Sequence, residues 1–428
     1  MHKEGLMQAQ NVSLWRHPNF LKLWIGQSVS LFGDQITLLA VPLVAVVTLH
    51  VPAAQLGFLG ATETAPILVL GLMAGVWVDR LPRRLLLIGA DLGRAVLLLL
   101  IPLAAWLGLL HMLILYIVAF GVGTLSVFFG VAYQAFLPTL LPREQLIEGN
   151  STLEISRSGS QVAGPAIAGF LVQFVTPPFA ILLDAGSFLW SALCVSLIRA
   201  QEPGPPPRRE QRHLWAEMMI GLRFVFGNPI LRAIAGCTGT ANLFGSVITT
   251  ILVLYLVRDL GATAGLLGII SASSNLGFLF GATLARRTAT RFGLGRTLVG
   301  APILASIGAL LIPLARGPLM LAVPLLIGAQ FLGSLGGTIY SINQLTLRQT
   351  ITPERLQGRM SASMRFIVIG AMPIGALLGG MLGQTIGLWP TLVVGAAGRL
   401  FPVLWVWFSP IRHTADQWLA KESAQLPV

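Results

Sequence analysis

Residues 71–94 read GLMAGVWVDRLPRRLLLIGADLGR, which is two apolar segments joined by a short turn that carries four charges. Each apolar segment is continuous and lacks the alternation of a strand, so both are expected to be membrane helices. Gly71 and Gly75 are four residues apart and therefore share one helix face, where glycine lets a neighbouring helix come close. The stretch predicts two packed membrane helices that are joined at the membrane edge.

The charged turn combines one carboxylate, Asp79, with the guanidinium groups of Arg80, Arg83 and Arg84. One carboxylate among three arginines at a membrane edge suggests a latch between helices. The same residues can instead be a basic anchor that only sets the topology. With the two glycines before it, this turn is our candidate for a cytoplasmic gate.

The composition indicates a membrane protein. The chain has 428 residues, of which 55% are hydrophobic and 10% are charged. Its net charge of +12 is spread over alternate loops and forms no single basic stripe, so a nucleic-acid partner is not expected. Cys194 and Cys237 lie within apolar segments, where they are expected to be packing residues and neither a disulfide nor a metal site.

We predict an all-α polytopic fold of twelve transmembrane helices, arranged as two pseudo-symmetric six-helix bundles. The first span begins near Phe20 and is too long for a signal peptide, so we expect it to be retained. The predicted spans fall within 20–48, 55–78, 85–107, 111–135, 150–175, 178–198, 229–257, 263–285, 297–315, 318–345, 357–385 and 388–409.

The loops of one side carry most of the Lys and Arg residues, whereas the opposite loops carry only Arg258 and Arg316. By the positive-inside rule, both termini and the long middle loop are expected in the cytoplasm. The predicted division is therefore a bundle at 1–198, a cytoplasmic middle loop at 199–228, and a second bundle with a cytoplasmic tail at 229–428.

The middle loop begins with a Pro-rich polar linker at 202–210, which cannot form a core. An amphipathic helix should follow it at the membrane surface, and either packing between the bundles or regulation would explain that helix. Its apolar face is expected to carry Trp215, Met218, Met219, Leu222 and Phe226.

The two halves resemble each other as an internal repeat would. Residues at matching positions are Gly71 and Gly277, Gly75 and Gly281, Arg80 and Arg286, Gln134 and Gln344, Glu144 and Glu354, and, with a small shift, Arg157 and Arg365. Asp79 has no acidic counterpart, because Ala285 stands at its matching position. The repeat therefore predicts a duplicated six-helix unit in which some charges remain in one copy only.

The stretch from Gly75 to Arg84 is similar to the cytoplasmic signature of the major facilitator superfamily, with Pro82 where glycine is usual. GSQVAGPAIAG at 159–169 resembles the fifth-helix motif of drug exporters and other antiporters. The residues that carry that motif are Gly159, Gly164, Pro165 and Gly169.

SLFGD at 30–34 and DLGRA at 91–95 resemble more narrowly the drug:proton antiporter branch, which includes macrolide efflux pumps and the enterobactin exporter. The resemblance implies secondary active transport by alternating access around a midplane site. It also implies that Asp79 meets the cytoplasmic end of the eleventh helix or an arginine when the transporter faces outward. Ala285 cannot do this, so the latch should be one-sided.

A charge near the middle of a membrane helix costs about 2.5–3.5 kcal/mol on insertion scales, so each one needs a partner, a wet cavity or a function. Asp34 lies roughly 20 Å deep by helical rise, and it is the first candidate for a proton carrier. The alternative is a static ion pair of Asp34 with Arg94. Glu63 could contact substrate or protons, or make a static hydrogen bond, while Asp184 is expected to be a shallow packing or interfacial carboxylate.

Arg157 and Arg365 are expected to mirror each other across the cavity, near the cytoplasmic ends of the fifth and eleventh helices. Arginine does not release its proton, so they could hold an anionic group, tune Asp34 or brace the cytoplasmic gate. Arg399 lies near the middle of the twelfth span, and the sequence names no partner for it.

These features together predict a secondary exporter of an amphipathic small molecule, such as an antibiotic, a siderophore or a related metabolite, by proton antiport. The alternatives are an importer or facilitator on the same fold, or a membrane-embedded enzyme or receptor. No catalytic constellation, metal-ligand spacing or nucleotide-binding loop is found, so neither an enzyme nor a cofactor is expected. We expect a monomer in the bacterial inner membrane whose partners are its substrate, protons and the lipid bilayer, and which confers multidrug resistance.

Overall fold

The computed structural model describes residues 14–78, 81–199 and 214–412, so Asp79 and Arg80 lie outside the described residues. Everything regular in these ranges is helical. The first half comprises η1 (Leu14–Arg16), α1 (Pro18–Leu43) with its π-helical extension η2 (Val44–Thr48), α2 (Ala53–Val78), α3 (Arg83–Trp106), α4 (Met112–Leu140), η3 (Arg143–Gln145), α5 (Leu146–Val175) and α6 (Pro177–Ser196).

The second half follows the short helix α7 (Leu214–Gly227). It comprises α8 (Pro229–Arg258), α9 (Ala264–Phe292), α10 (Leu294–Leu311) with η4 (Ile312–Leu314), α11 (Leu319–Ile351), α12 (Glu354–Thr385), α13 (Leu388–Gly398) and α14 (Phe401–Trp407). The last predicted span is thus broken into α13 and α14, because the helix is interrupted at Arg399 and Leu400.

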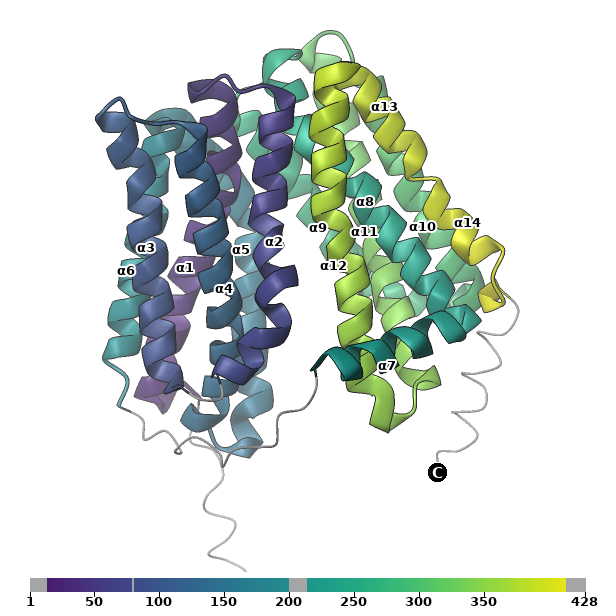
Figure 1. Ribbon diagram of the computed structural model, residues 1–428, viewed down its shortest axis with the longest axis horizontal. Helices are drawn as coiled ribbons and strands as arrows, with labels where there is room; N and C mark the ends of the chain where they lie inside the picture. The colour runs from purple at the N-terminus through teal and green to yellow at the C-terminus, as the bar shows by residue number, and fades with distance from the viewer. Residues whose placement is uncertain (1–13, 79–80, 200–213, 413–428) are drawn as a thin grey trace, which may run out of the picture.

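The helices form two six-helix bundles side by side, which confirms the predicted all-α membrane fold (Figure 1). In the described ranges, eleven helical segments are long and apolar enough to cross a membrane. The helix α5 spans 30 residues but is not one of them, because polar residues such as Arg157, Gln161 and Gln173 recur along it. It packs between α1 and α9 and completes the twelve spans.

The helix α7 marks one face of the molecule, which we call the linker face, and it lies at the lower edge of the second bundle (Figure 1). Gly221 allows α7 to lie directly on the Arg359 carbonyl at the start of α12, and Met218 and Val225 are buried. Met219 and Phe226 of the predicted apolar face are instead about half exposed. Trp215 was predicted on that face too, and its side chain lies outside the described residues.

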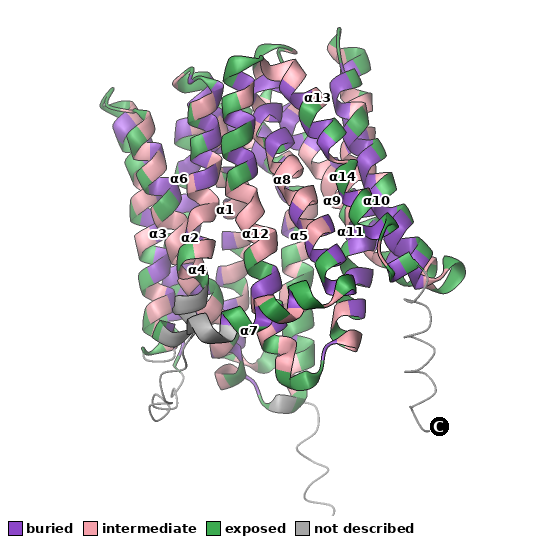
Figure 2. Ribbon diagram, turned by 45° about the vertical axis from the view of Figure 1, so that its right-hand side comes forward, coloured by how far each residue is buried: buried purple, intermediate pink, exposed green. Residues whose placement is uncertain are grey.

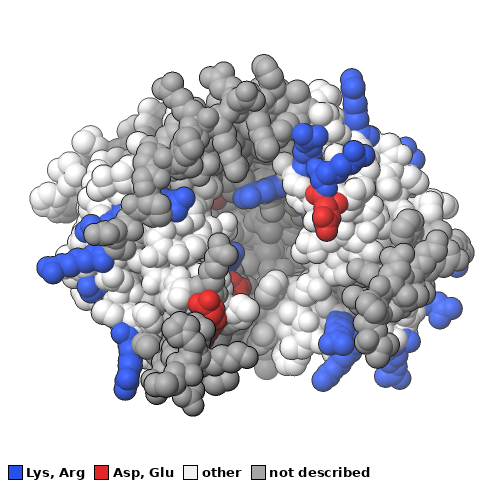
Figure 3. Space-filling model, turned by 90° about the horizontal axis from the view of Figure 1, so that it is seen from below, with Lys and Arg blue, Asp and Glu red and all other residues white. Residues whose placement is uncertain are grey.

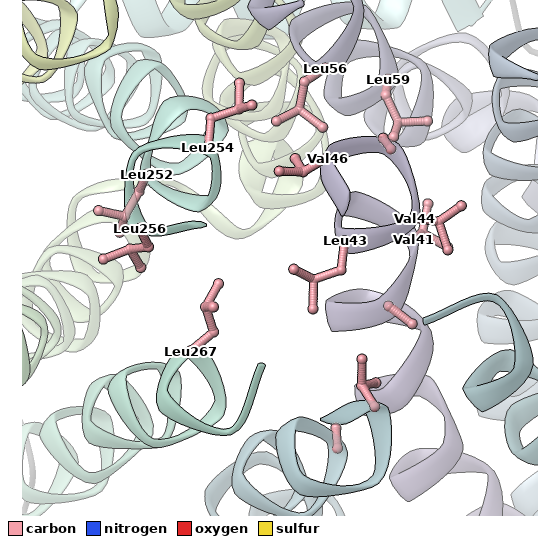
Figure 4. Close-up of a cluster of buried hydrophobic side chains, with 14 of the residues drawn as sticks. Val41, Leu43, Val44, Val46, Leu56, Leu59, Leu252, Leu254, Leu256 and Leu267 are labelled. Atoms are coloured by element: carbon pink, nitrogen blue, oxygen red, sulfur yellow. The ribbon is translucent and has the colours of Figure 1, made fainter. Parts of the chain in front are cut away.

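The hydrophobic core is distributed unevenly between the two faces. Toward the face opposite the linker face, which we call the far face, one continuous cluster of buried side chains joins both bundles. Figure 4 shows Val46 and Leu56 of the first bundle near Leu254 of the second. At the linker face each bundle has a separate core. Buried and exposed residues alternate along the helices of both bundles (Figure 2).

The bundles therefore hold together at the far face, and the described residues form no common core between them at the linker face. Seen from the linker face, the surface is hollowed between them (Figure 3). Because apolar burial is the main favourable term in packing, this uneven distribution defines the closed end and the open end of the gap.

Candidate functional site

A cluster of charged side chains is buried inside the first bundle, between α1, α3 and α6. Asp91 and Arg94 of α3 form an ion pair, and both are almost fully buried. They are three residues apart, so they lie on the same face of the helix. The Arg94 guanidinium is also stacked between two aromatic rings, 4.4 Å from the centroid of Phe129 and 4.1 Å from that of Phe188. Arg94 is thus fixed in the bundle interior by charge and by aromatic contact.

Asp184 of α6 belongs to the same cluster and is completely buried. Its carboxylate accepts hydrogen bonds from the hydroxyl groups of Thr37 and Ser187, the latter at 3.0 Å. Gly33 allows this, because a side chain at that position would overlap the carboxylate. Asp184 is therefore a packed carboxylate inside the bundle, one of the two roles expected for it, and not an interfacial one. The packing of α6 on α1 produces this burial.

Asp34 lies in the same turn of α1 as Gly33 and Thr37, the two residues that contact Asp184. Unlike Asp184, Asp34 is only partly buried. Among the described residues, the ion pair of Arg94 is with Asp91 and not with Asp34, so the static pair considered for Asp34 is not formed. The site consequently brings three carboxyl groups to one guanidinium, with Asp34 as its most accessible member.

The gap between the bundles is bounded by two helix pairs, of which α2 and α12 form one. Near the far face, Gly57 lies against Gly380 and the Ala376 carbonyl so closely that a side chain would overlap them. Toward the linker face the same two helices separate around a pocket of about 290 Å³. Its lining residues are Ile67, Leu68, Gly71, Ser361, Ala362, Arg365, Phe366 and Ile369.

The second pair, α5 and α9, repeats this geometry. Gly169 lies against Gly268 toward the far face, and Gly265 donates its backbone N–H to the Gln173 side chain at 3.1 Å. Closer to the linker face, the Asn275 side chain donates a hydrogen bond to the Gln161 carbonyl across the bundles. Both pairs are therefore tight at the far face and diverge from there.

Arg157 and Arg365 occupy matching places on these two pairs. Each lies about three turns from the start of its helix, one turn or more beyond the last close contact with the opposite bundle. Arg365 lines the pocket, and Arg157 is four residues from Gln161, hence on the face of α5 that meets α9. Both side chains are exposed, and within the described ranges neither forms an ion pair.

Glu63 lies one turn from Gly60, a residue of α2 that contacts Ala376 of the second bundle. Its side chain is partly exposed, and its backbone packs on α4 at Gly123. This places Glu63 just inside the tight far-face contact of α2 with α12.

Of the predicted gate, the described residues are the glycines and two arginines. Arg83 donates to the Ala135 carbonyl of α4 at 3.0 Å, and Arg84 donates to the Val195 and Ser196 carbonyls at the end of α6. Arginines bound to carbonyls at helix ends stabilise those ends. Gly71 makes no close contact with a neighbouring helix, contrary to expectation, because it faces the open pocket.

The fifth-helix motif serves two different contacts. Gly164 admits the Gln35 side chain of α1, whereas Gly169 admits α9. Pro165 is buried, and its carbonyl lies against Gly268. Gly159 faces open space, and no contact explains it.

Arg399, within the last span of the second bundle, is partly buried and has a partner that the sequence did not reveal. Arg399 donates to the Ala241 carbonyl of α8 at 2.8 Å, and its own carbonyl accepts from the Ser306 hydroxyl at 2.6 Å. It lies where α13 gives way to α14. Backbone carbonyls have no sequence signature, so this pairing could not be found from the residues alone.

Two helical bundles that surround a gap closed at one end define a transporter of the major facilitator superfamily. Solved structures of this class superpose over almost the whole chain. The nucleoside transporter NupG gives a TM-score of 0.73 at 12% identity and covers 91% of this chain and 98% of its own. A bacterial homologue of the iron transporter ferroportin, in an inward-facing state, gives 0.69 at 17% identity, with 92% and 98% covered.

Within this class the sequence profile of the transmembrane secretion effectors matches residues 9–427, and the chain belongs to that family. It is 27% identical over 371 residues to the multidrug efflux pump Tap of Mycolicibacterium fortuitum, covering 84% of this chain and 88% of Tap. It is 28% identical over 379 residues to the enterobactin exporter EntS of Escherichia coli, covering 87% of each. The protein is a multi-pass membrane transporter with efflux relatives, and not an enzyme.

Proposed function

We propose that this protein exports an amphipathic small molecule across the bacterial cytoplasmic membrane by alternating access, driven by proton entry. The direction rests on the relatives, since Tap is named a multidrug efflux pump and EntS an enterobactin exporter. Lys and Arg residues gather around the linker face (Figure 3), which supports its placement in the cytoplasm by the positive-inside rule. The gap then opens to the cytoplasm, where an exported molecule enters.

The observation that carries the proton coupling is the cluster of Asp34, Asp91, Asp184 and Arg94. One guanidinium cannot neutralise three carboxylates, and an unpaired charge is costly to bury. Asp91 has the arginine and Asp184 has two hydroxyl donors, which leaves Asp34, the partly exposed member, as the group that takes up and releases the proton. Asp184, beside the same turn of α1, positions Asp34 and adds to the negative charge around it.

The substrate would enter between the diverging ends of α2 and α12 and of α5 and α9. Arg157 and Arg365 offer positive charge from opposite walls, and Glu63 lies deeper, beneath the far-face seal. Apolar residues such as Ile67 and Ile369 line the pocket next to Arg365, which suits a molecule with both apolar and polar parts. Such a mixed lining supports an amphipathic cargo.

Alternation requires the far-face contacts to open and the linker face to close. The far-face seal is made of glycine-to-backbone contacts, apolar side chains and hydrogen bonds such as that from Arg258 to the Val51 carbonyl. It can separate without breaking an ion pair of the described residues. Gly71 has free space beside it, so α12 can approach α2 there when the pocket closes. Rocking of the two bundles about their midplane would connect these two states.

The test is transport by the purified protein in liposomes with an imposed pH gradient, with a panel of cationic, neutral and anionic amphipathic compounds. Movement of a compound against its concentration gradient, away from the linker face and only while the proton gradient lasts, is expected. Equilibration of the same compounds without a gradient would show a facilitator. Gradient-driven uptake toward the linker face would show an importer.

A further inference from the structure

A second groove lies on the outer side of the second bundle, away from the gap. It has a volume of about 470 Å³ and is formed between the start of α8 and the end of α14. Its lining residues are Pro229, Arg232, Ala233, Phe401, Leu404, Trp405, Phe408, Ser409 and Pro410. The helix α14 is at the outer edge of the bundle, near the linker face (Figure 1). The groove therefore opens toward the membrane and not toward the transport pathway.

Trp405, one of the lining residues, packs against a glycine of α8. Gly236 of α8 lies flat against the Trp405 ring, and any side chain there would overlap it. The walls remain apolar and exposed, with Phe401 53%, Leu404 47% and Phe408 81% accessible. Exposed aromatic and aliphatic side chains of this kind suit an acyl chain, and aromatic rings are enriched at the level of lipid headgroups.

One cation stands in this apolar lining. Arg232 lies one turn from the first residue of α8, is exposed, and makes a single long hydrogen bond of 3.4 Å to the Phe226 carbonyl. Within the described ranges it has no carboxylate partner. The lining contains no Asp or Glu, while the Ser409 hydroxyl adds a polar group beside it. The groove thus combines an apolar floor with an uncompensated positive charge at its rim.

We infer that this groove binds an anionic phospholipid of the leaflet at the linker face, with its phosphate at Arg232 and an acyl chain along Phe401, Leu404 and Trp405. Basic pockets on the cytoplasmic side of membrane helices bind such headgroups, and each basic residue near an anionic surface contributes about 1 kcal/mol. A neutral lipid would fill the same apolar floor but would gain less at the arginine.

The test is native mass spectrometry of the full-length protein with phosphatidylglycerol, with phosphatidylcholine of the same acyl chains, and with glycerol 3-phosphate. We expect phosphatidylglycerol to bind about fivefold more tightly than phosphatidylcholine, the ratio that about 1 kcal/mol gives. Arg232→Ala should remove this preference and Arg232→Lys should retain it. Arg223→Ala is the matched control, because Arg223 is also exposed at the linker face but does not line the groove.

Three results would overturn the inference. Equal binding of the two lipids, or a preference that survives Arg232→Ala, would remove the anionic headgroup from the groove. Equally tight binding of glycerol 3-phosphate would show a simple anion site without a lipid. A preference that arises only when residues 413–428 are deleted would show that this tail fills the groove in the intact chain. Melting temperatures of all variants would verify that they are folded.

Discussion

The two bundles share one scaffold but not one chemistry. The first holds three carboxyl groups and an arginine between α1, α3 and α6, whereas the equivalent helices α8, α10 and α13–α14 contain no Asp or Glu. In the second bundle, the partly buried Arg399 is bound to a backbone carbonyl instead. A duplicated unit can thus keep its helix packing while only one copy holds groups able to exchange a proton.

The glycines of the repeat differ in a similar way. Gly277 and Gly281 of α9 lie directly on the Phe331 and Leu335 carbonyls of α11, within the second bundle. Gly71, which matches Gly277, faces the open pocket. The same sequence feature serves fixed packing in one bundle and, on our proposal, a contact that forms only in the other transport state.

The largest effect is expected from Asp34→Asn. If the first bundle alone carries the proton, this variant should lose gradient-driven export to the background of empty liposomes while remaining folded, because the amide keeps the shape but not the titration. Glu354→Gln, the same chemical change at an exposed site of the second bundle, should keep full transport. Undiminished uphill export by Asp34→Asn would show that Asp34 does not carry the proton, and the proposed difference between the bundles would be lost.

Next in size is the stability cost of Asp91→Asn. Leaving Arg94 buried without its partner should lower the free energy of unfolding by about 3 kcal/mol, measured by chemical denaturation in detergent. Arg399→Met should change the same quantity by less than about 1 kcal/mol, because no opposite charge is left unpaired.

A double variant sharpens this second prediction. Adding Arg94→Met to Asp91→Asn should recover most of the lost stability, since the uncompensated charge is then gone. Equal losses for Asp91→Asn and Arg399→Met would mean that Arg94 and Arg399 are held in the same way.

Substitutions of the two matching glycines should have different effects on the stability of the protein. Gly277→Ala should destabilise the protein by about 1–3 kcal/mol, because its methyl group would overlap the Phe331 carbonyl. Gly71→Ala should stay within about 0.5 kcal/mol of the parent, since its side chain enters open space. The melting temperature of each variant in detergent measures the difference, and comparable losses at both positions would show that Gly71 is packed.

The smallest effect concerns the turn at Asp79, which lies outside the described residues. If Asp79 latches the first bundle in the outward-facing state, Asp79→Ala should increase the fraction of molecules open at the linker face. Spin-label distances across that face measure this fraction. Ala285→Ser, at the matching place in the second bundle, should leave it unchanged. Identical distance distributions for Asp79→Ala and the parent would contradict a one-sided latch.

Much of the fold followed from local features of the sequence. The length of the apolar segments and the distribution of Arg and Lys predicted the spans, and these had to be helices because a membrane segment must satisfy its own backbone polar groups. The internal repeat predicted the two bundles. The matching places of Arg157 and Arg365 followed from the same repeat. The amphipathic helix was also predicted, although its contact with α12 exposes Met219 and Phe226 on the opposite side.

Only part of the charged cluster was predicted from the sequence. Asp34 and Arg94 stood out because each is a charge inside a span, and the three-residue spacing of Asp91 and Arg94 was a signal that could have paired them. Asp184 was expected to be either a packing or an interfacial carboxylate, and which of the two it is depends on how closely Gly33 lets α6 approach α1. The partner of Arg399 is a carbonyl, a group that every residue has.

The sequence by itself determined that this chain crosses a membrane as two related helical units, and that charges lie within several of its spans. Hydropathy and repeat spacing are properties of the linear sequence, so the order of the residues is enough to show them. Only the tertiary structure decided which charges meet, which end of the gap is sealed, and which glycines contact a neighbouring helix. Those outcomes depend on contacts between helices that are far apart in the sequence, where one glycine or one carbonyl sets the distance of approach.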